Sequence, residues 1–215
     1  MQEQLSLKLP YRPSYGRGDF LVAPCNFEAV QWIDHCDSWC TPAIIIYGES
    51  GCGKSHLATT FSPVCLDARM MDLSQLPTVC PKHTVIEHID ETVHEETLFH
   101  LYNRIIGQGS KLLMTARQIP QFRLKDLQSR INATPKIAIS TPDEELIYAV
   151  FYKAFQDRQL MIEPKVIEYA VLRIPRSFEA VKKVFEQADS LSLSRGQKVT
   201  IPLMKSAIEQ ALSSC

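Results

Sequence analysis

One octapeptide combines the residue types that can hold a phosphate group. It is Gly48-Glu49-Ser50-Gly51-Cys52-Gly53-Lys54-Ser55, which fits the pattern G-x-x-x-x-G-K-[ST]. Glycines let successive backbone N–H groups turn toward phosphate oxygens, the lysine adds a positive charge, and the serine hydroxyl can ligate Mg²⁺. An apolar run at 43–47 precedes the octapeptide, and a helix is predicted at 54–61. We therefore predict that all eight residues contact ADP or ATP, with Mg²⁺ as the metal.

A second candidate is the acid at the end of the run Thr84-Val85-Ile86-Glu87. A nucleotide-hydrolysing loop protein needs a carboxylate at a strand end to hold Mg²⁺ through water, and Glu87 has that position. His88 stands where the water-activating acid is expected, and histidine is a weaker base that can also become cationic. We expect weak or absent intrinsic hydrolysis, unless Asp90 or Glu91 takes the role through a shifted register.

The elements that must position these residues alternate along the chain. Short apolar runs indicate strands, and the segment 95–107 has the broad apolar face of a helix. Strand and helix alternation predicts a three-layer α/β unit with a parallel sheet and right-handed crossovers. Thr115 ends one predicted strand, where it is either a sensor of the γ-phosphate or a plain strand cap. The predicted strands are 43–47, 64–66, 84–86, 111–115 and 136–139.

Three segments are predicted from the change of pattern along the chain. Residues 1–24 are rich in proline and glycine and indicate an extended arm. Residues 25–140 form the α/β core, with Asn26 as the expected cap of its first helix. Residues 141–215 contain helical patterns only and indicate a small bundle, whose first helix is expected to be capped by Thr141. The predicted bundle helices are 143–157, 163–173, 176–193 and 202–213.

Composition narrows the class of protein. Hydrophobic residues make up 45% and charged residues 22%, as in globular proteins. The 23 basic and 24 acidic residues give a net charge of −1, which argues against binding DNA by charge alone. No apolar run reaches membrane-spanning length and no secretion signal is present, so we expect a cytoplasmic protein without membrane contact. Seven irregularly spaced cysteines are expected to be reduced thiols.

Two clusters suggest a transition metal but lack the usual spacing. One is a group of histidines and acids in 83–100, where His94 and His100 are six residues apart rather than the four that share a helical face. The other is His35-Cys36 with Cys40. We therefore expect no metal other than Mg²⁺. Phe27, Trp32 and Trp39 are expected to be core or docking aromatics.

The chain resembles a known family over nearly its whole length. The octapeptide, the Glu87 strand and Thr115 precede Leu127-Gln128-Ser129-Arg130 and Ile174-Pro175-Arg176-Ser177-Phe178. This order resembles the AAA+ ATPase of the bacterial replication initiator DnaA and, more closely, its shorter regulatory homologues of the Hda family. The resemblance implies an AAA+ P-loop core followed by a C-terminal helical lid. It also implies an association with the nucleoid or replisome and a possible homo-oligomer.

The start of the chain adds to this resemblance. Gln4-Leu5-Ser6-Leu7-Lys8-Leu9 is similar to the peptide by which Hda proteins dock on the DNA polymerase sliding clamp, with Lys8 where a proline is usual. Such a segment orders on binding, with the Gln4 amide in a small pocket and Leu5, Leu7 and Leu9 against an apolar groove around Ser6. From pattern alone, an N-terminal edge strand is the alternative.

The resemblance also assigns individual roles. Arg130 matches the arginine finger, which acts in trans on a neighbouring subunit's nucleotide, although spacing alone favours a surface arginine. Arg176 matches the second sensor of the lid, and Arg173 is a neighbour with which it is easily confused. Asp19, Phe20 and Asn26 lie in a region similar to the adenine-binding entrance.

The implied function is negative regulation of replication initiation. With the DNA-loaded sliding clamp (the β subunit), the protein would stimulate hydrolysis of the ATP bound to DnaA, using Arg130. Because the chain ends after the lid, no direct sequence-specific DNA binding is expected. The alternatives are an autonomous AAA+ ATPase that loads a helicase, and a DnaA-like core without its DNA-binding part.

Overall fold

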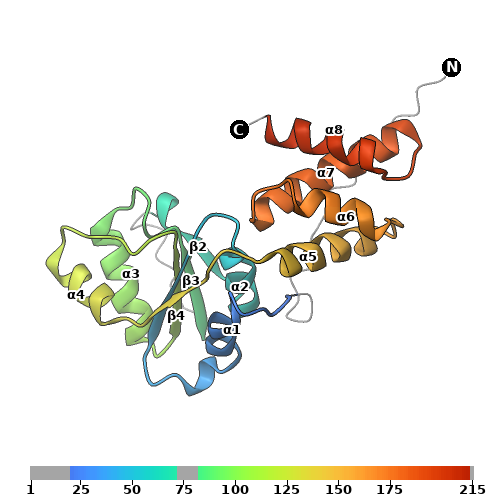
Figure 1. Ribbon diagram of the computed structural model, residues 1–215. Helices are drawn as coiled ribbons and strands as arrows, with labels where there is room; N and C mark the ends of the chain where they lie inside the picture. Colours follow the sequence, from blue (N-terminus) through green and yellow to red (C-terminus); the bar gives the residue numbers. More distant parts are fainter. Residues whose placement is uncertain (1–19, 72–81, 214–215) are drawn as a thin grey trace. The chain divides into compact units, whose positions relative to one another are not determined.

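The computed structural model describes residues 20–71 and 82–213 of the chain. They form two compact units, with the division between Thr141 and Pro142. The N-terminal unit is an α/β core and the C-terminal unit is a helical bundle, the lid (Figure 1). In the described ranges no helix is both long enough and apolar enough to cross a bilayer. The clamp-like residues Gln4, Leu5, Ser6, Leu7 and Leu9, and also Asp19, lie outside the described residues.

The core is built on a five-stranded sheet in which every neighbouring pair is parallel. The strand order is β2-β3-β4-β1-β5. Strands β1, β3 and β4 have almost wholly buried, β-branched or leucine-rich sequences, as expected for a parallel sheet covered on both faces. The strands are β1 (Ala43–Tyr47), β2 (Cys65–Asp67), β3 (His83–Glu87), β4 (Lys111–Ala116) and β5 (Lys136–Ala138).

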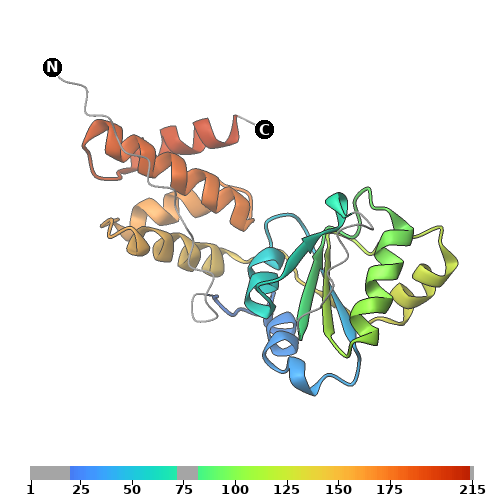
Figure 2. The same ribbon diagram turned by 180° about the vertical axis from the view of Figure 1, so that it is seen from behind.

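Helices cover both faces of this sheet, so the predicted three-layer α/β architecture is confirmed (Figures 1 and 2). On one face, Ile44 and Ile46 pack with residues of α1 and α2, and we call this the P-loop layer. On the other face, Ile45 and Met114 pack with residues of α3 and α4, which we call the opposite layer. The core helices are α1 (Phe27–Asp34), α2 (Lys54–Phe61), α3 (Glu95–Gly107) and α4 (Lys125–Ala133), with the 3₁₀ turns η2 (Cys36–Ser38) and η3 (Ala68–Met70).

Two aromatic residues anchor the P-loop layer. Trp39 is buried and stacks on Phe61, with ring centroids 5.4 Å apart, so it is a core residue as expected. Phe20 is buried in the same cluster, which places the start of the described chain in the packed core.

The lid is held by its own apolar centre. The rings of Phe151 and Phe155, on the first lid helix, stack on each other. The Phe185 ring, from another lid helix, packs edge-to-face against Phe155 with centroids 5.0 Å apart. The expected threonine cap is wrong in one detail: the cap of the first lid helix is Asp143, whose carboxylate accepts the N–H of Leu146 at 2.8 Å. The lid helices are α5 (Glu144–Asp157), α6 (Pro164–Val171), α7 (Phe178–Arg195) and α8 (Ile201–Leu212).

Candidate functional site

The phosphate loop turns directly from β1 into α2, and its first glycine is required by space. A Cβ at Gly48 would lie 2.3 Å from the carbonyl oxygen of Ile139, which is far inside contact distance. Gly53 is the N-cap of α2 with φ 102°, a conformation that favours glycine. The backbone N–H groups of the loop therefore lie next to the N-terminus of α2, whose partial positive charge favours binding of an anion.

Lys54 lies in the mouth of this loop. Its Nζ donates hydrogen bonds to the carbonyl oxygens of Gly48 at 2.6 Å and Glu49 at 2.8 Å. Ser55 follows in the first turn of α2 and is exposed, so its hydroxyl is accessible to a metal-bound water. Cys52 is buried, and burial raises the pKa of its thiol, which makes it a packing residue of the loop. These positions suit a lysine and a serine that bind phosphate and Mg²⁺.

Glu87 ends β3 beside the P-loop layer. Val85, two residues earlier, belongs to that layer, so strand alternation places Glu87 on the same face of the sheet as α2. Its Oε2 accepts a hydrogen bond from the Cys65 thiol at 3.1 Å. Its Oε1 is buried and has no hydrogen-bond partner within the described part of the chain. A buried carboxylate oxygen without a donor fits the water shell of a Mg²⁺ ion.

His88 is held in an unusual conformation beside this acid. Its φ is 61°, a left-handed value that non-glycine residues seldom adopt outside turns and functional sites. Its Nδ1 lies 3.4 Å from Oδ1 of Asp67, at the end of β2. The Arg69 guanidinium binds the same carboxylate and holds the pKa of Asp67 at about 2. His88 thus lies beside a carboxylate that is already paired with the Arg69 guanidinium.

The two alternative acids are committed to other partners. Asp90 Oδ2 accepts backbone N–H groups from Arg117 at 2.9 Å and Gln118 at 3.4 Å, and so holds the loop after β4. Glu91 pairs with the side chains of Arg69 and Arg117. This geometry favours Glu87 over the shifted register as the carboxylate of the site.

Thr115 is the buried polar residue of β4. Leu113, two residues earlier, packs in the P-loop layer, so alternation places the Thr115 side chain on the same face as Glu87. The strand continues one residue further, to Ala116, whose carbonyl oxygen accepts the N–H of Gly48 at 3.2 Å. The ends of β1, β3 and β4 thus bring the loop, Glu87 and Thr115 to one edge of the sheet.

Arg130 lies in the last turn of α4 and is exposed. Its guanidinium carbon lies 5.9 Å from the centre of the Tyr102 ring, on the outside of the opposite layer. In residues 20–71 and 82–213 it forms no ion pair with an acid. The structure therefore places Arg130 in a different layer of the core from the phosphate loop.

The two lid arginines have different surroundings. Arg176 precedes the Ser177 cap of α7 and forms an ion pair with Glu144, both side chains being exposed. Arg173 lies 3.8 Å from the Tyr169 ring centre and donates to the carbonyl oxygen of the same residue. The Arg173 guanidinium thus contacts Tyr169 of the preceding helix, α6. Arg176 instead pairs with an exposed acid, Glu144, from which it could dissociate to bind a phosphate.

The region similar to an adenine entrance is held by buried contacts. Phe20 meets the His56 ring of α2 edge-to-face at 4.9 Å. Asn26 is the N-cap residue of α1, as expected, but its side chain makes no capping hydrogen bond. Its Oδ1 accepts the N–H of Ala23 and its Nδ2 donates to the carbonyl oxygen of Leu21, so it braces the preceding loop.

Sequence reasoning missed Cys65, the hydrogen-bond donor to Glu87. It comes from the neighbouring strand, where Cys65 pairs in register with Val85. A cysteine distant in sequence from the motif carries no local sign of this contact.

Comparison with known proteins agrees with this architecture. Residues 143–208 match the family described as "Hda, lid domain". A protein of Haemophilus influenzae described as uncharacterized is 25% identical over 186 aligned positions, which cover 76% of this chain and 80% of that protein.

Two solved structures share the fold of the whole chain. Domain III of the Thermotoga maritima replication initiation protein DnaA has a TM-score of 0.77 at 15% identity, covering 95% of this chain and 98% of that one. A replication initiator DnaA bound to AMPPCP and single-stranded DNA has a TM-score of 0.62 at 15% identity, covering 95% and 82% of the two chains. With the parallel-sheet core and the phosphate loop, these likenesses show a DnaA-like AAA+ fold whose lid matches the Hda lid family.

Proposed function

We propose that this protein is a nucleotide-bound negative regulator of replication initiation. With the DNA-loaded sliding clamp, it stimulates hydrolysis of the ATP bound to DnaA. The loop 48–55 holds ADP or ATP, with Ser55 and Glu87 toward Mg²⁺ and Thr115 near the terminal phosphate. The bound Mg²⁺ would balance phosphate charge, while Lys54 orients the phosphates.

The observation that carries the proposal is the place of Arg130. An arginine that assists hydrolysis must reach the transferred phosphoryl group, where it offsets developing charge. Arg130 is exposed, has no acidic partner within the described residues, and belongs to the layer opposite the phosphate loop. A guanidinium with this placement is suited to the nucleotide of a second AAA+ molecule.

The test is Arg130→Ala in a DnaA–ATP hydrolysis assay with clamp loaded on DNA. Arginine fingers contribute about 10³-fold or more in rate, so stimulation should fall to near background. ADP binding and clamp pull-down should be unchanged. The matched control is Lys125→Ala, an exposed cation at the other end of the same helix, which should retain stimulation. Stimulation retained by Arg130→Ala would refute the proposal.

The clamp contact is proposed from the resemblance of residues 4–9. Gln4→Ala should lose capture by immobilised sliding clamp, because the amide is the polar anchor of such peptides. Gln2→Ala, two residues earlier, is the matched control and should bind normally. Equal binding of both variants would remove the clamp from the mechanism.

Arg176 is proposed as the lid sensor, with Glu144 as the partner that it exchanges for nucleotide phosphate. Arg176→Ala should weaken ADP binding by about tenfold, the value of one charge-assisted contact. Arg173→Ala is the control, because its guanidinium is occupied by Tyr169. Equal affinity for ADP in Arg176→Ala and the parent would show that Arg176 has no sensor role.

An autonomous ATPase is the second candidate, favoured by Oε1 of Glu87, which is buried and has no hydrogen-bond partner among residues 20–71 and 82–213. A steady-state assay without partners separates the two functions. The regulator is expected to turn over weakly, because His88 replaces the usual acid. Robust turnover that Glu87→Gln abolishes would favour the autonomous enzyme.

A further inference from the structure

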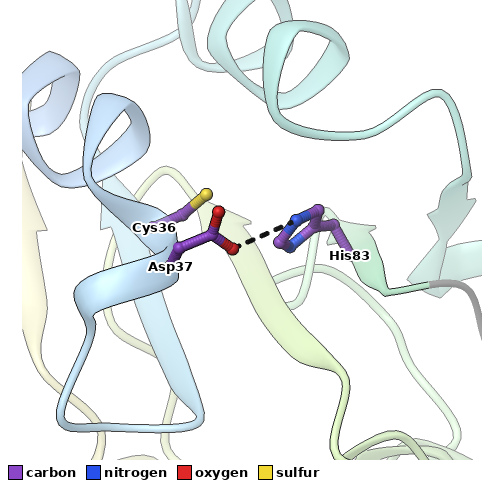
Figure 3. Close-up of side chains that lie close together, drawn as sticks. All are labelled: Cys36, Asp37 and His83. Carbon is purple, nitrogen blue, oxygen red and sulfur yellow. Dashed lines mark ion pairs between the residues drawn. The ribbon is translucent and has the colours of Figure 1, made fainter.

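Three potential metal ligands meet at the amino-terminal end of β3. Cys36 and Asp37 come from the turn η2, and His83 is the first residue of the strand (Figure 3). One ligand atom from each of the three lies within 4.8 Å of the others. Asp37 Oδ1 and His83 Nε2 are 3.9 Å apart. Residues that are far apart in the sequence thus present sulfur, oxygen and nitrogen to one point.

Packed elements hold the His83 ring and the backbone of the turn that carries Cys36 and Asp37. The His83 ring lies 5.1 Å from the ring of Phe61, and its carbonyl oxygen accepts the Ser62 hydroxyl at 2.7 Å. The turn η2 is closed by the backbone bond from the Trp39 N–H to the carbonyl oxygen of Cys36. Trp39 itself is buried against Phe61, so turn and strand share one support. Ligands fixed by packing lose little freedom on binding an ion.

The donor set selects the class of ion. Thiolate, imidazole and carboxylate together are typical ligands of Zn²⁺, and they do not match the all-oxygen preference of Mg²⁺ or Ca²⁺. Tetrahedral Zn²⁺ places such donor atoms about 3.3–3.6 Å apart, given its usual bond lengths. The observed separations need a contraction of roughly 1 Å, which the exposed Asp37 side chain can supply by rotation.

The pKa shift of His83 favours metal binding, whereas that of Cys36 opposes it. Burial lowers the pKa of His83, so its imidazole keeps a lone pair at neutral pH. Burial raises the pKa of the Cys36 thiol, so binding must release the thiol proton to water as the metal–sulfur bond forms.

We propose that Cys36, Asp37 and His83 form a Zn²⁺ site with a water molecule as the fourth ligand. This site is separate from the nucleotide site, because His83 and Glu87 lie at opposite ends of β3. Four residues of strand span about 13 Å. The ion would join the turn η2 to the sheet and so stabilise the core.

A competing cation lies beside the ligands. Lys82 Nζ is 2.7 Å from Asp37 Oδ1, so the metal must displace this ion pair. If the cluster only stabilises the fold, removing Lys82 should lower stability and leave metal binding absent. If the cluster binds a metal, removing Lys82 should raise its affinity for the ion. The Lys82→Gln variant therefore separates the two interpretations.

The experiment is titration of the full-length, untagged protein with Co²⁺, followed by displacement with Zn²⁺. Cobalt bound to a thiolate gives a charge-transfer band in the near ultraviolet, which should saturate at one ion per chain and disappear with Zn²⁺. Cys36→Ser should abolish the band and His83→Gln should weaken binding by more than roughly 100-fold. Lys82→Gln should tighten binding up to roughly fivefold, the effect of losing one exposed ion pair.

The controls are Cys40→Ser and His35→Gln, neighbours of the same types that lie outside the cluster. Both should bind Co²⁺ like the parent. In the parent, Zn²⁺ at a hundred times its dissociation constant should raise the Tm by about 5–10 °C, and Cys36→Ser should lose that shift. A band that persists in Cys36→Ser, or no saturable binding in the parent, would overturn the proposal. Circular dichroism of each metal-free variant shows that it is folded, so the result stays decisive.

Discussion

The two edges of the parallel sheet carry sites of different origin. At the carboxyl-terminal edge, the phosphate loop, Glu87 and Thr115 follow from strand ends and from one contiguous octapeptide. At the amino-terminal edge, Cys36, Asp37 and His83 are adjacent only because η2 and β3 meet in the fold.

Each edge also contains a cysteine beside an acid, but the chemistry differs. Cys65 donates to Glu87, whereas Cys36 lies beside Asp37, whose charge Lys82 offsets. A contiguous motif can thus be recognised from the sequence, while an assembled site requires the fold. Because Cys65 donates a hydrogen bond to Glu87 while Cys36 lies near the Lys82 cation, we expect the two thiols to differ in reactivity.

The largest expected effect is on the reactivity of Cys65. Burial, the hydrogen bond to Glu87 and its charge raise the pKa of this thiol from 9.0 to about 12, although the residue as a whole is exposed. The thiolate fraction at pH 8 is therefore about a thousandfold below that of an ordinary thiol. Alkylation by iodoacetamide, mapped by mass spectrometry, should be slow at Cys65 and rise about tenfold per pH unit for as long as the protein stays folded.

Cys36 sharpens this comparison. Burial and the Asp37 charge raise the pKa of Cys36, and the Lys82 charge opposes them in part; because Cys36 lacks the hydrogen bond to an acid that Cys65 makes, it should be alkylated faster than Cys65. Glu87→Gln removes the charge beside Cys65 and should speed its alkylation by roughly tenfold or more. If Cys65 is alkylated as fast as Cys36 in the parent protein, the hydrogen bond to Glu87 does not suppress the reactivity of Cys65.

The next effect concerns the backbone of the phosphate loop. Gly48→Ala would force a Cβ against the carbonyl oxygen of Ile139, at 2.3 Å, and should cost about 3 kcal/mol of unfolding free energy. Gly107→Ala is the matched control, since a Cβ there has no neighbour within 4 Å and alanine favours the helix. Urea unfolding measures both. A loss below 1 kcal/mol for Gly48→Ala would mean that the loop end is adaptable.

Most of the fold was predictable because its signals are local. The strand 43–47 and the helices 54–61 and 95–107 have the predicted bounds, since apolar periodicity and flanking glycines depend on neighbouring residues. The strand ending at Glu87 also follows from its own apolar run. The roles of Arg130, Arg176 and the clamp-like peptide remain predictions from resemblance.

The errors arose where a side chain has partners outside its own segment. Asn26 has the expected N-cap position, but its side chain binds the loop before the helix. Thr141 is not the cap of the first lid helix, because Asp143 is next to the first helical residue. The expectation of no metal other than Mg²⁺ remains a prediction. Its spacing argument concerns ligands on one helix and does not address His83 and Cys36, which come from different elements.

The smallest expected effects are on stability, at the N-cap residues of α5 and α1. They test whether each N-cap side chain bonds only within its own helix start or also to a neighbouring loop. Serine is a good N-cap, so Asp143→Ser should change stability by less than about 0.5 kcal/mol. Asn26→Ser should cost about 1–2 kcal/mol, because serine cannot replace both buried bonds that Asn26 makes to Ala23 and Leu21. Thermal unfolding followed by circular dichroism measures both variants. Equal, small losses of stability in both variants would mean that Asn26 acts only as a helix cap. Its bonds to Ala23 and Leu21 would then contribute little to stability.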